Sequence, residues 1–196
     1  LNFNIKRKIN LKRILKNFSF LSVNLILKIM SSIYFNIHFN NKNRIVHLDK
    51  FFYPLDSIGG WNYFYGKKGF IQFQILIRKK NAANNIYKII SYLIKNDQIS
   101  FLSTIKKLGN KNDNYLSFPD NGYTLTMDIK NNKKMRTKFQ KLEKFLIKID
   151  SKIYLTKDSL MSQNLFFKSY KNLKLFKNTI NKLNKFESLQ SKRLNI

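Results

Sequence analysis

Several residue types are scarce or missing in this 196-residue sequence, and each absence excludes a class of site. Cysteine is missing, which excludes disulfides, a thiolate nucleophile and cysteine-ligated zinc. The only two histidines are His38 and His47, and no acids stand at the spacing of a DxD or HExxH pair. Glycine occurs six times and forms neither a P-loop nor a dinucleotide-binding GxGxxG pattern. We therefore predict that the chain has no metal centre.

Acidic residues are also scarce, with 10 Asp and Glu against 38 Lys and Arg, so the net charge is +28. Such a charge favours a nucleic-acid or anionic-membrane partner. Only six of the basic residues are arginine, whose planar fork is the group that reads guanine and phosphate in bidentate fashion. Lys, Asn, Ile, Phe and Tyr share A/T-rich codons, so an AT-rich genome explains the same composition. A selected polyanion site stays the alternative.

The apolar content is high, because 43% of residues are hydrophobic and 15% are aromatic, which excludes simple disorder. Period-two alternation predicts strands over 70–78, 100–107, 122–130 and 152–156. Helical spacing predicts helices over 84–96, 134–149, 159–168 and 170–184. This order predicts an α+β fold, with a mostly antiparallel or mixed sheet covered by helices on one face.

The N-terminal part resembles a targeting segment, because a basic stretch (1–17) precedes a largely apolar one (18–39). Asn24, Lys28 and Asn36 interrupt the apolar run, and a charge near the centre of a membrane span is costly. We therefore favour an amphipathic segment over a signal peptide or membrane anchor.

Few residues indicate chemistry by themselves. Gln72 and Gln74 stand two apart on a predicted strand and would project amides to one side, either to bind a polyhydroxyl ligand or to face solvent. His47 has a pKa suited to a general base, but a structural or surface role is the commoner one for such a histidine. The residues alone favour a solvated charge for each lysine and a core position for Tyr154.

Five blocks of sequence carry a family resemblance. They are FFYPLDSIGGWNYFYGKKGFIQFQ (51–74), SFLSTIKKLG (100–109), LSFPDNGYTLTMDI (116–129), IYLTKDSLMS (153–162) and FESLQSKRL (186–194). In this order they resemble the C-terminal substrate, or cap, domain of FAD-dependent oxidoreductases of the vanillyl-alcohol-oxidase type. Within that family they are most similar to the bacterial oxidases of decaprenylphosphoryl-ribose and of sugar lactones. The resemblance covers residues 45–196.

The resemblance implies a domain organisation and a reaction. Residues 1–44 would be the remnant of a crossover between two domains, 45–196 would be the substrate domain, and the N-terminal FAD-binding domain would be absent from this chain. The family oxidises a sugar hydroxyl to a ketone, with hydride passing to FAD. By itself, this chain would then be inactive.

The matching blocks imply roles for particular residues. Lys157 would be catalytic, because a fixed cation beside the flavin stabilises the negative charge that arrives with the hydride. Tyr154 in the same block would help Lys157 to bind the cofactor. The residues implied to bind substrate are Gln72, Gln74, Lys106, Thr124 and Thr126. Some family members carry Asn and Cys at the positions of Thr124 and Thr126, so the substrate is not defined by the resemblance.

The implied partners are an FAD-binding domain in cis or in trans, a polyprenyl-phosphate sugar or sugar-lactone substrate, and a short-chain dehydrogenase that would complete an epimerisation. No specific nucleic acid is expected as a partner. The expected location is the bacterial cytoplasm, with membrane association left open. Two alternatives remain: a basic nucleic-acid-associated protein, and an inactive truncated gene product.

Overall fold

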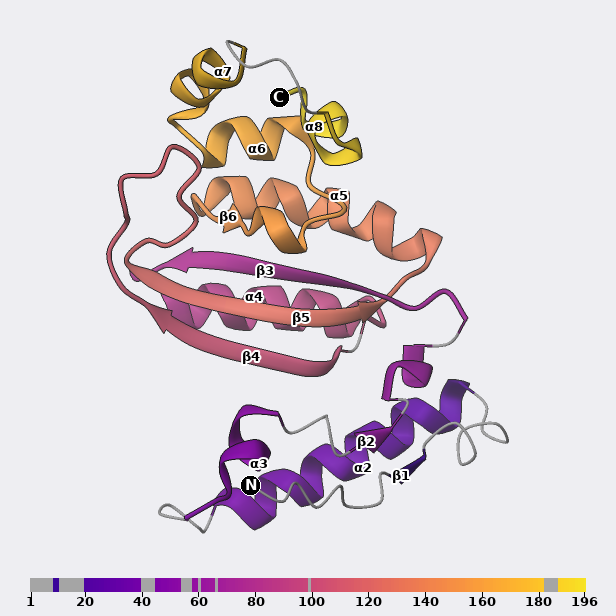
Figure 1. Ribbon diagram of the computed structural model, residues 1–196. Helices are drawn as coiled ribbons and strands as arrows, with labels where there is room; N and C mark the ends of the chain where they lie inside the picture. The colour runs from indigo at the N-terminus through magenta and orange to yellow at the C-terminus, as the bar shows by residue number, and fades with distance from the viewer. Residues whose placement is uncertain are drawn as a thin grey trace, which may run out of the picture. The chain divides into compact units, whose positions relative to one another are not determined.

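A computed structural model describes residues 9–10, 20–39, 45–53, 58–59, 61–65, 67–98, 100–181 and 187–196. The chain divides into two compact units, Leu1–Gly69 and Phe70–Ile196 (Figure 1). This division falls later than the boundary near residue 45 that the resemblance implied. The assignment of 45–196 to a substrate domain stays a prediction.

The first unit contains short elements around one long helix. Its elements are β1 (Ile9–Asn10), α2 (Phe20–Phe39), α3 (Leu48–Phe52), β2 (Ile58–Gly59) and the 3₁₀ helix η1 (Trp61–Tyr65), and β1 pairs with β2 in parallel. His47 caps α3, since its Nδ1 accepts a hydrogen bond from the Asp49 backbone at 3.3 Å. His47 therefore has a structural role here. The His38 side chain and most of the basic stretch 1–17 lie outside the described residues.

The helix α2 coincides with the apolar run 18–39. Every side chain of α2 that the structure describes is exposed, so the expected packing of this segment against a core is not seen among them. Within the described part of the chain, no helix combines the length and the apolar character needed to cross a membrane.

The second unit is built around a four-stranded antiparallel sheet of order β4-β5-β3-β6. Its elements are β3 (Phe70–Arg78), α4 (Ala82–Lys95), β4 (Ser100–Leu108), β5 (Gly122–Lys130), α5 (Lys133–Lys148), β6 (Lys152–Ile153), η2 (Leu155–Lys157), α6 (Gln163–Ser169), α7 (Leu173–Asn181) and α8 (Leu189–Leu194). The helix α4 links two parallel strands, β3 and β4, and β5 lies between them. This is the split β-α-β arrangement of ferredoxin-like folds. The predicted α+β class is confirmed.

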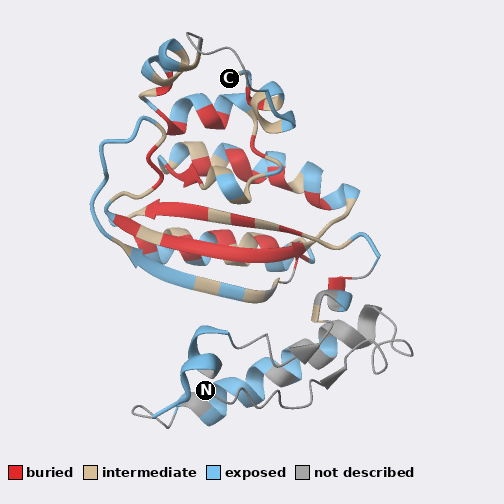
Figure 2. Ribbon diagram, in the orientation of Figure 1, coloured by how far each residue is buried: buried red, intermediate tan, exposed pale blue. Residues whose placement is uncertain are grey.

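One face of the sheet carries the core. Alternate residues of β3, from Ile71 to Ile77, and of β5, from Leu125 to Ile129, form one buried cluster with the apolar stripes of α4 and α5. Asn132 begins α5 by accepting a hydrogen bond from Met135 N at 2.6 Å, as an N-cap does. Figure 2 shows β5 buried along its length and the edge strand β4 largely exposed. The helices α4 and α5 cover the face that carries this core cluster and leave the opposite face uncovered.

Gly122 begins β5 at a point where the backbone of β3 lies too close to admit a side chain. A Cβ atom there would collide with the Ile77 carbonyl oxygen and lie 3.1 Å from its carbon. We expect Gly122→Ala to lower the free energy of unfolding by about 1–3 kcal/mol, because backbone must move to admit the methyl group. Urea unfolding of the chain measures this change.

Gly109 offers the matched control, because nothing lies within 4 Å of a Cβ built there. Gly109→Ala should change the unfolding free energy by less than about 0.5 kcal/mol. Equal effects of the two substitutions would contradict the close approach at Gly122.

Candidate functional site

Five predicted substrate-binding residues share the sheet face that lies away from α4 and α5. In an antiparallel sheet, residues directly opposite one another project to the same face. The register pairs Gln74 with Thr126 and Lys106 with Thr124. Gln72 lies two residues before Gln74 on β3, and Thr124 lies two residues before Thr126 on β5, so these side chains project to the same face. Three strands thus bring Gln72, Gln74, Lys106, Thr124 and Thr126 together. We call this surface the polar sheet face.

The polar sheet face is buried at its centre and exposed at its edge. Thr124 and Thr126 on the central strand are buried, Gln72 and Gln74 are partly buried, and Lys106 on the edge strand is exposed. The Thr124 hydroxyl oxygen has no hydrogen-bond partner among the described residues. A buried hydroxyl without a partner is costly, so it marks a place where a polar ligand would supply the missing hydrogen bond.

The polar sheet face also contains a buried acid that the sequence argument did not select. Asp128 lies opposite Gln72 and is 2% exposed, and its Oδ1 accepts a 2.6 Å hydrogen bond from Gln72 Nε2. Its position two residues beyond Thr126 is the signal that could have found it, since Thr124, Thr126 and Asp128 alternate on one strand.

Burial raises the pKa of Asp128 above its usual value, although the hydrogen bond from Gln72 and the positive charge of Lys157 both oppose the rise. Lys157 is the last residue of η2. It lies close enough to Asp128 for its positive charge to lower the pKa of that carboxyl group. The segment of η2 lies beside β3, because Tyr154 N donates to Gln74 O at 2.9 Å. The structure thus brings the cation Lys157 to the same part of the sheet as Asp128 and Gln72.

Tyr154 is half-buried and packs its ring against Phe118, with 4.8 Å between the ring centroids. Phe118 belongs to the connection between β4 and β5, in the block 116–129. The residues alone favoured a core position for Tyr154, but it lies outside the main core cluster. Two of the sequence blocks meet at this aromatic pair.

The C-terminal block anchors the segment that carries Lys157. The side chain of Asp158, 2% exposed, accepts hydrogen bonds from Leu160 N at 2.9 Å and Met161 N at 2.8 Å. Arg193 Nη2 reaches the second oxygen of Asp158 at 2.6 Å, and Gln190 donates to Leu155 O at 2.7 Å. Gln190 and Arg193, from the last of the five sequence blocks, therefore hold the segment 155–161 in position.

The Asp128 carboxylate should make stability depend on pH. Its folded pKa lies above the ordinary 3.8, so the folded state binds the proton more tightly and stability falls as the pH rises through this range. We expect Asp128→Asn to raise the melting temperature of the chain at pH 7 and to leave it unchanged at a pH below the ordinary value. Thermal unfolding across pH measures the difference.

Asp113 is an exposed acid in the connection between β4 and β5, and Asp113→Asn provides the control. It should leave the pH dependence of the melting temperature as it is in the original chain. A loss of stability in Asp128→Asn at pH 7 would contradict the assigned direction of the pKa shift.

The donor set of the polar sheet face suits an organic ligand with hydroxyl and carbonyl groups. Within the described ranges, no group of three His, Asp or Glu residues could hold a metal ion. The face offers two amides, two hydroxyls with one unpartnered oxygen, and the cation Lys157 near a buried carboxylate. This set fits a sugar, and Lys157 fits the electron-rich edge of a flavin.

No protein-family model matches the chain. The chain is similar to decaprenylphosphoryl-β-D-ribose oxidase of Mycolicibacterium smegmatis, with 29% identity over 129 residues. The chain is thus related to an oxidase. The matched segment covers 66% of this chain and 28% of the relative, so the chain spans less than a third of this relative's length.

Proposed function

We propose that this chain supplies the substrate-binding part of an FAD-dependent oxidase that converts a sugar hydroxyl to a ketone. An FAD-binding domain, present in cis or in trans, would complete the enzyme. The substrate class would be a polyprenyl-phosphate sugar or a sugar lactone. The related protein of Mycolicibacterium smegmatis supports the first, since it is named as an oxidase of decaprenylphosphoryl ribose.

One observation carries this proposal. The five residues implied to bind substrate come from three strands and from three separate sequence blocks, and the fold brings them to one face of one sheet. Residues of the block that holds Lys157 run along the edge of that same sheet. Alternation alone places polar residues on the face that helices leave uncovered. The burial of Thr124 and Thr126, with a Thr124 hydroxyl that has no partner among the described residues, is what a solvated surface would not require.

The side chains have distinct tasks in the proposed reaction. When bound, FAD would supply the acceptor for the hydride that leaves the substrate carbinol carbon, and the hydroxyl proton would leave to a base or to water. Lys157 holds a positive charge where negative charge increases during the transfer. Asp128 helps to keep that charge in place and takes one amide hydrogen of Gln72, so the Gln72 carbonyl oxygen stays available to a substrate hydroxyl. The Thr124 hydroxyl is a second contact for the sugar.

The experiment is reconstitution. The chain is co-expressed with the FAD-binding domain of the related oxidase, and the purified complex is mixed anaerobically with a polyprenyl-phosphate ribose or a sugar lactone. We expect the flavin absorbance to bleach with one of these substrates, and the FAD-binding domain alone to stay oxidised. A complex that binds flavin but is bleached by neither substrate would overturn the proposed function.

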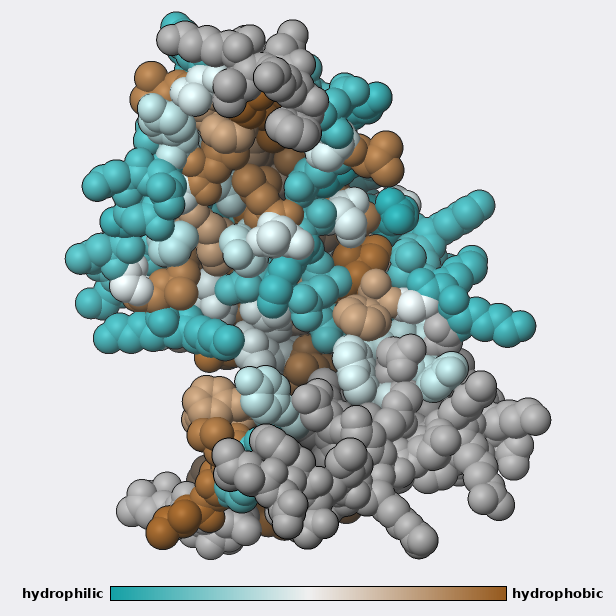
Figure 3. All heavy atoms as spheres, in the orientation of Figure 1, coloured by the Kyte–Doolittle hydropathy of each residue, from teal (hydrophilic) through white to brown (hydrophobic). Residues whose placement is uncertain are grey.

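The net charge of +28 favours one other candidate, a nucleic-acid-associated protein. Figure 3 shows hydrophilic residues scattered over the visible face of the second unit, with apolar residues between them, and not gathered into one stripe. We therefore expect weak nucleic-acid binding that is indifferent to sequence and falls steeply with salt. Tight, sequence-selective binding at physiological salt would favour this second candidate.

A further inference from the structure

The second unit holds a pocket of about 160 Å³ that shares no residue with the polar sheet face. It lies where the end of β3, the connection between β4 and β5, β6 and the end of α6 with the connection to α7 meet. Its charged lining residues are Arg78, Lys111, Asp120, Lys152 and Lys171. Four cations therefore face a single carboxylate.

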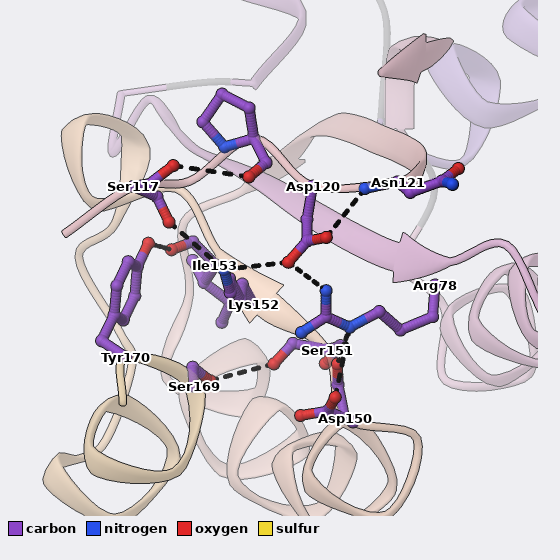
Figure 4. Close-up of polar contacts among 11 residues, drawn as sticks. Arg78, Ser117, Asp120, Asn121, Asp150, Ser151, Lys152, Ile153, Ser169 and Tyr170 are labelled. Atoms are coloured by element: carbon purple, nitrogen blue, oxygen red, sulfur yellow. Dashed lines mark hydrogen bonds and ion pairs between the residues drawn. The ribbon is translucent and has the colours of Figure 1, made fainter. Parts of the chain in front are cut away.

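Lys152 is the buried cation of this pocket. The residue is 6% exposed, and its Nζ donates to Ser117 O at 3.2 Å and to Asp120 Oδ2 at 3.5 Å (Figure 4). The Ser117 carbonyl carries no net charge, and the distance to Asp120 is long for a charge-assisted hydrogen bond. The buried ammonium is thus only partly neutralised by the protein.

Asp120 is shared between two cations. Arg78 Nη1 forms an ion pair with the same Oδ2 atom that Lys152 contacts, and Arg78 Nε contacts Asp150 at 3.2 Å on its other side (Figure 4). Burial would raise the pKa of Asp120, but hydrogen bonds from Arg78 and the Asn121 backbone, with the charges of Arg78 and Lys152, bring it below its usual value. Asp120 stays ionised, and both of its oxygen atoms already have partners: Arg78 and Lys152 at Oδ2 and the Asn121 backbone at Oδ1.

Two further cations are free to act on a ligand. Lys111 and Lys171 line the pocket from the connection 109–121 and from the residues before α7, and both are exposed. Neither makes an ion pair with any acid in the described part of the chain. At the base, Asp120 and Asp150 balance the charges of Arg78 and Lys152. The surplus of positive charge in the pocket therefore lies at its rim, on Lys111 and Lys171.

We propose that this pocket binds a phosphate group, either as inorganic phosphate or as the phosphomonoester of a small molecule. Lys152 and Arg78 form the base of the site, and Lys111 and Lys171 close on the oxygen atoms from the rim. The volume suits such a group, since it is smaller than the pockets of drug-sized ligands.

The titration of Lys152 agrees with this assignment. Burial lowers the pKa of Lys152, and the Asp120 charge only partly opposes that effect. A bound dianion would add the missing negative charge and raise the Lys152 pKa again. The site needs no flavin, so it stands or fails independently of the proposed oxidase function.

The test is calorimetric titration of the full 196-residue chain with inorganic phosphate and, separately, with ribose 5-phosphate, at constant ionic strength set with chloride. We expect one equivalent to bind with a Kd below about 1 mM. Equal affinity for the two ligands assigns the pocket to the phosphate group alone, and tighter binding of ribose 5-phosphate assigns it to a phosphomonoester. Absence of binding to both ligands overturns the proposal.

A pair of double variants separates the pocket from general charge. Lys111→Ala with Lys171→Ala removes the two rim cations, which make no ion pair among the described residues, and should weaken phosphate binding at least about tenfold. Lys144→Ala with Lys148→Ala removes the same charge from exposed positions of α5 and should change the affinity less than about twofold. Equal losses in both double variants would show attraction to net charge only and overturn the site.

Discussion

Replacement of Lys157 by alanine is expected to slow flavin reduction in the reconstituted complex by about 10²–10³-fold, which corresponds to about 2.7–4 kcal/mol. The reason is electrostatic: the hydride brings negative charge into a partly buried site, and Lys157 is the cation whose field reaches the buried Asp128. Stopped-flow absorbance under anaerobic conditions measures the rate. Lys157→Arg keeps the charge and should recover part of it.

A matched control is available on the opposite side of the sheet. Lys144 is exposed on α5, which packs against the core face, so Lys144→Ala removes one charge without touching the polar sheet face. It should leave flavin reduction unchanged. If Lys157→Ala also leaves the rate unchanged, Lys157 has no part in the reaction.

Lys157 can also be examined in the chain without flavin. Its charge lowers the pKa of Asp128, so Lys157→Ala should raise that pKa further, and carboxyl NMR titration of Asp128 measures the change. A pKa that does not move would place Lys157 too far from Asp128 to share a site with it.

The strands that position this site were predictable because their pattern is local. The predicted bounds 70–78 and 122–130 coincide with β3 and β5, and alternation alone places Gln72 and Gln74 on one face. The predicted strand 152–156 is shorter in the structure: β6 ends at Ile153, and the chain turns into η2. This turn changes the direction of Lys157, which strand alternation would have placed differently.

The contacts that complete the site depend on register and strand order, which a single sequence does not contain. Nothing in the pattern of β5 says that Asp128 lies opposite Gln72 and not opposite Gln74, although a shift of register would separate this pair. The exposure of Lys106 follows from the edge position of β4. The pocket around Lys152 joins residues from 78 to 172, so no short motif could reveal it.

Asp158 anchors the segment that carries Lys157 through its hydrogen bonds to Leu160, Met161 and Arg193. We expect Asp158→Ala to lower the free energy of unfolding by about 3 kcal/mol, since it leaves the Leu160 and Met161 N–H groups and the Arg193 guanidinium without their buried acceptor. Chemical denaturation measures this loss. In the reconstituted complex, the variant should also reduce flavin more slowly, because Lys157 is then less firmly held.

The C-terminal block supplies its own control. Glu187 pairs with Lys192 at 2.9 Å, but both side chains are at least 60% exposed, so water screens the pair. Glu187→Ala should therefore cost less than about 1 kcal/mol and leave flavin reduction unchanged. The Glu187–Lys192 and Asp158–Arg193 ion pairs thus differ mainly in the burial of their side chains. If Asp158→Ala were as mild as Glu187→Ala, the C-terminal block would not be what positions Lys157, and the support for that residue would have to come from β3 alone.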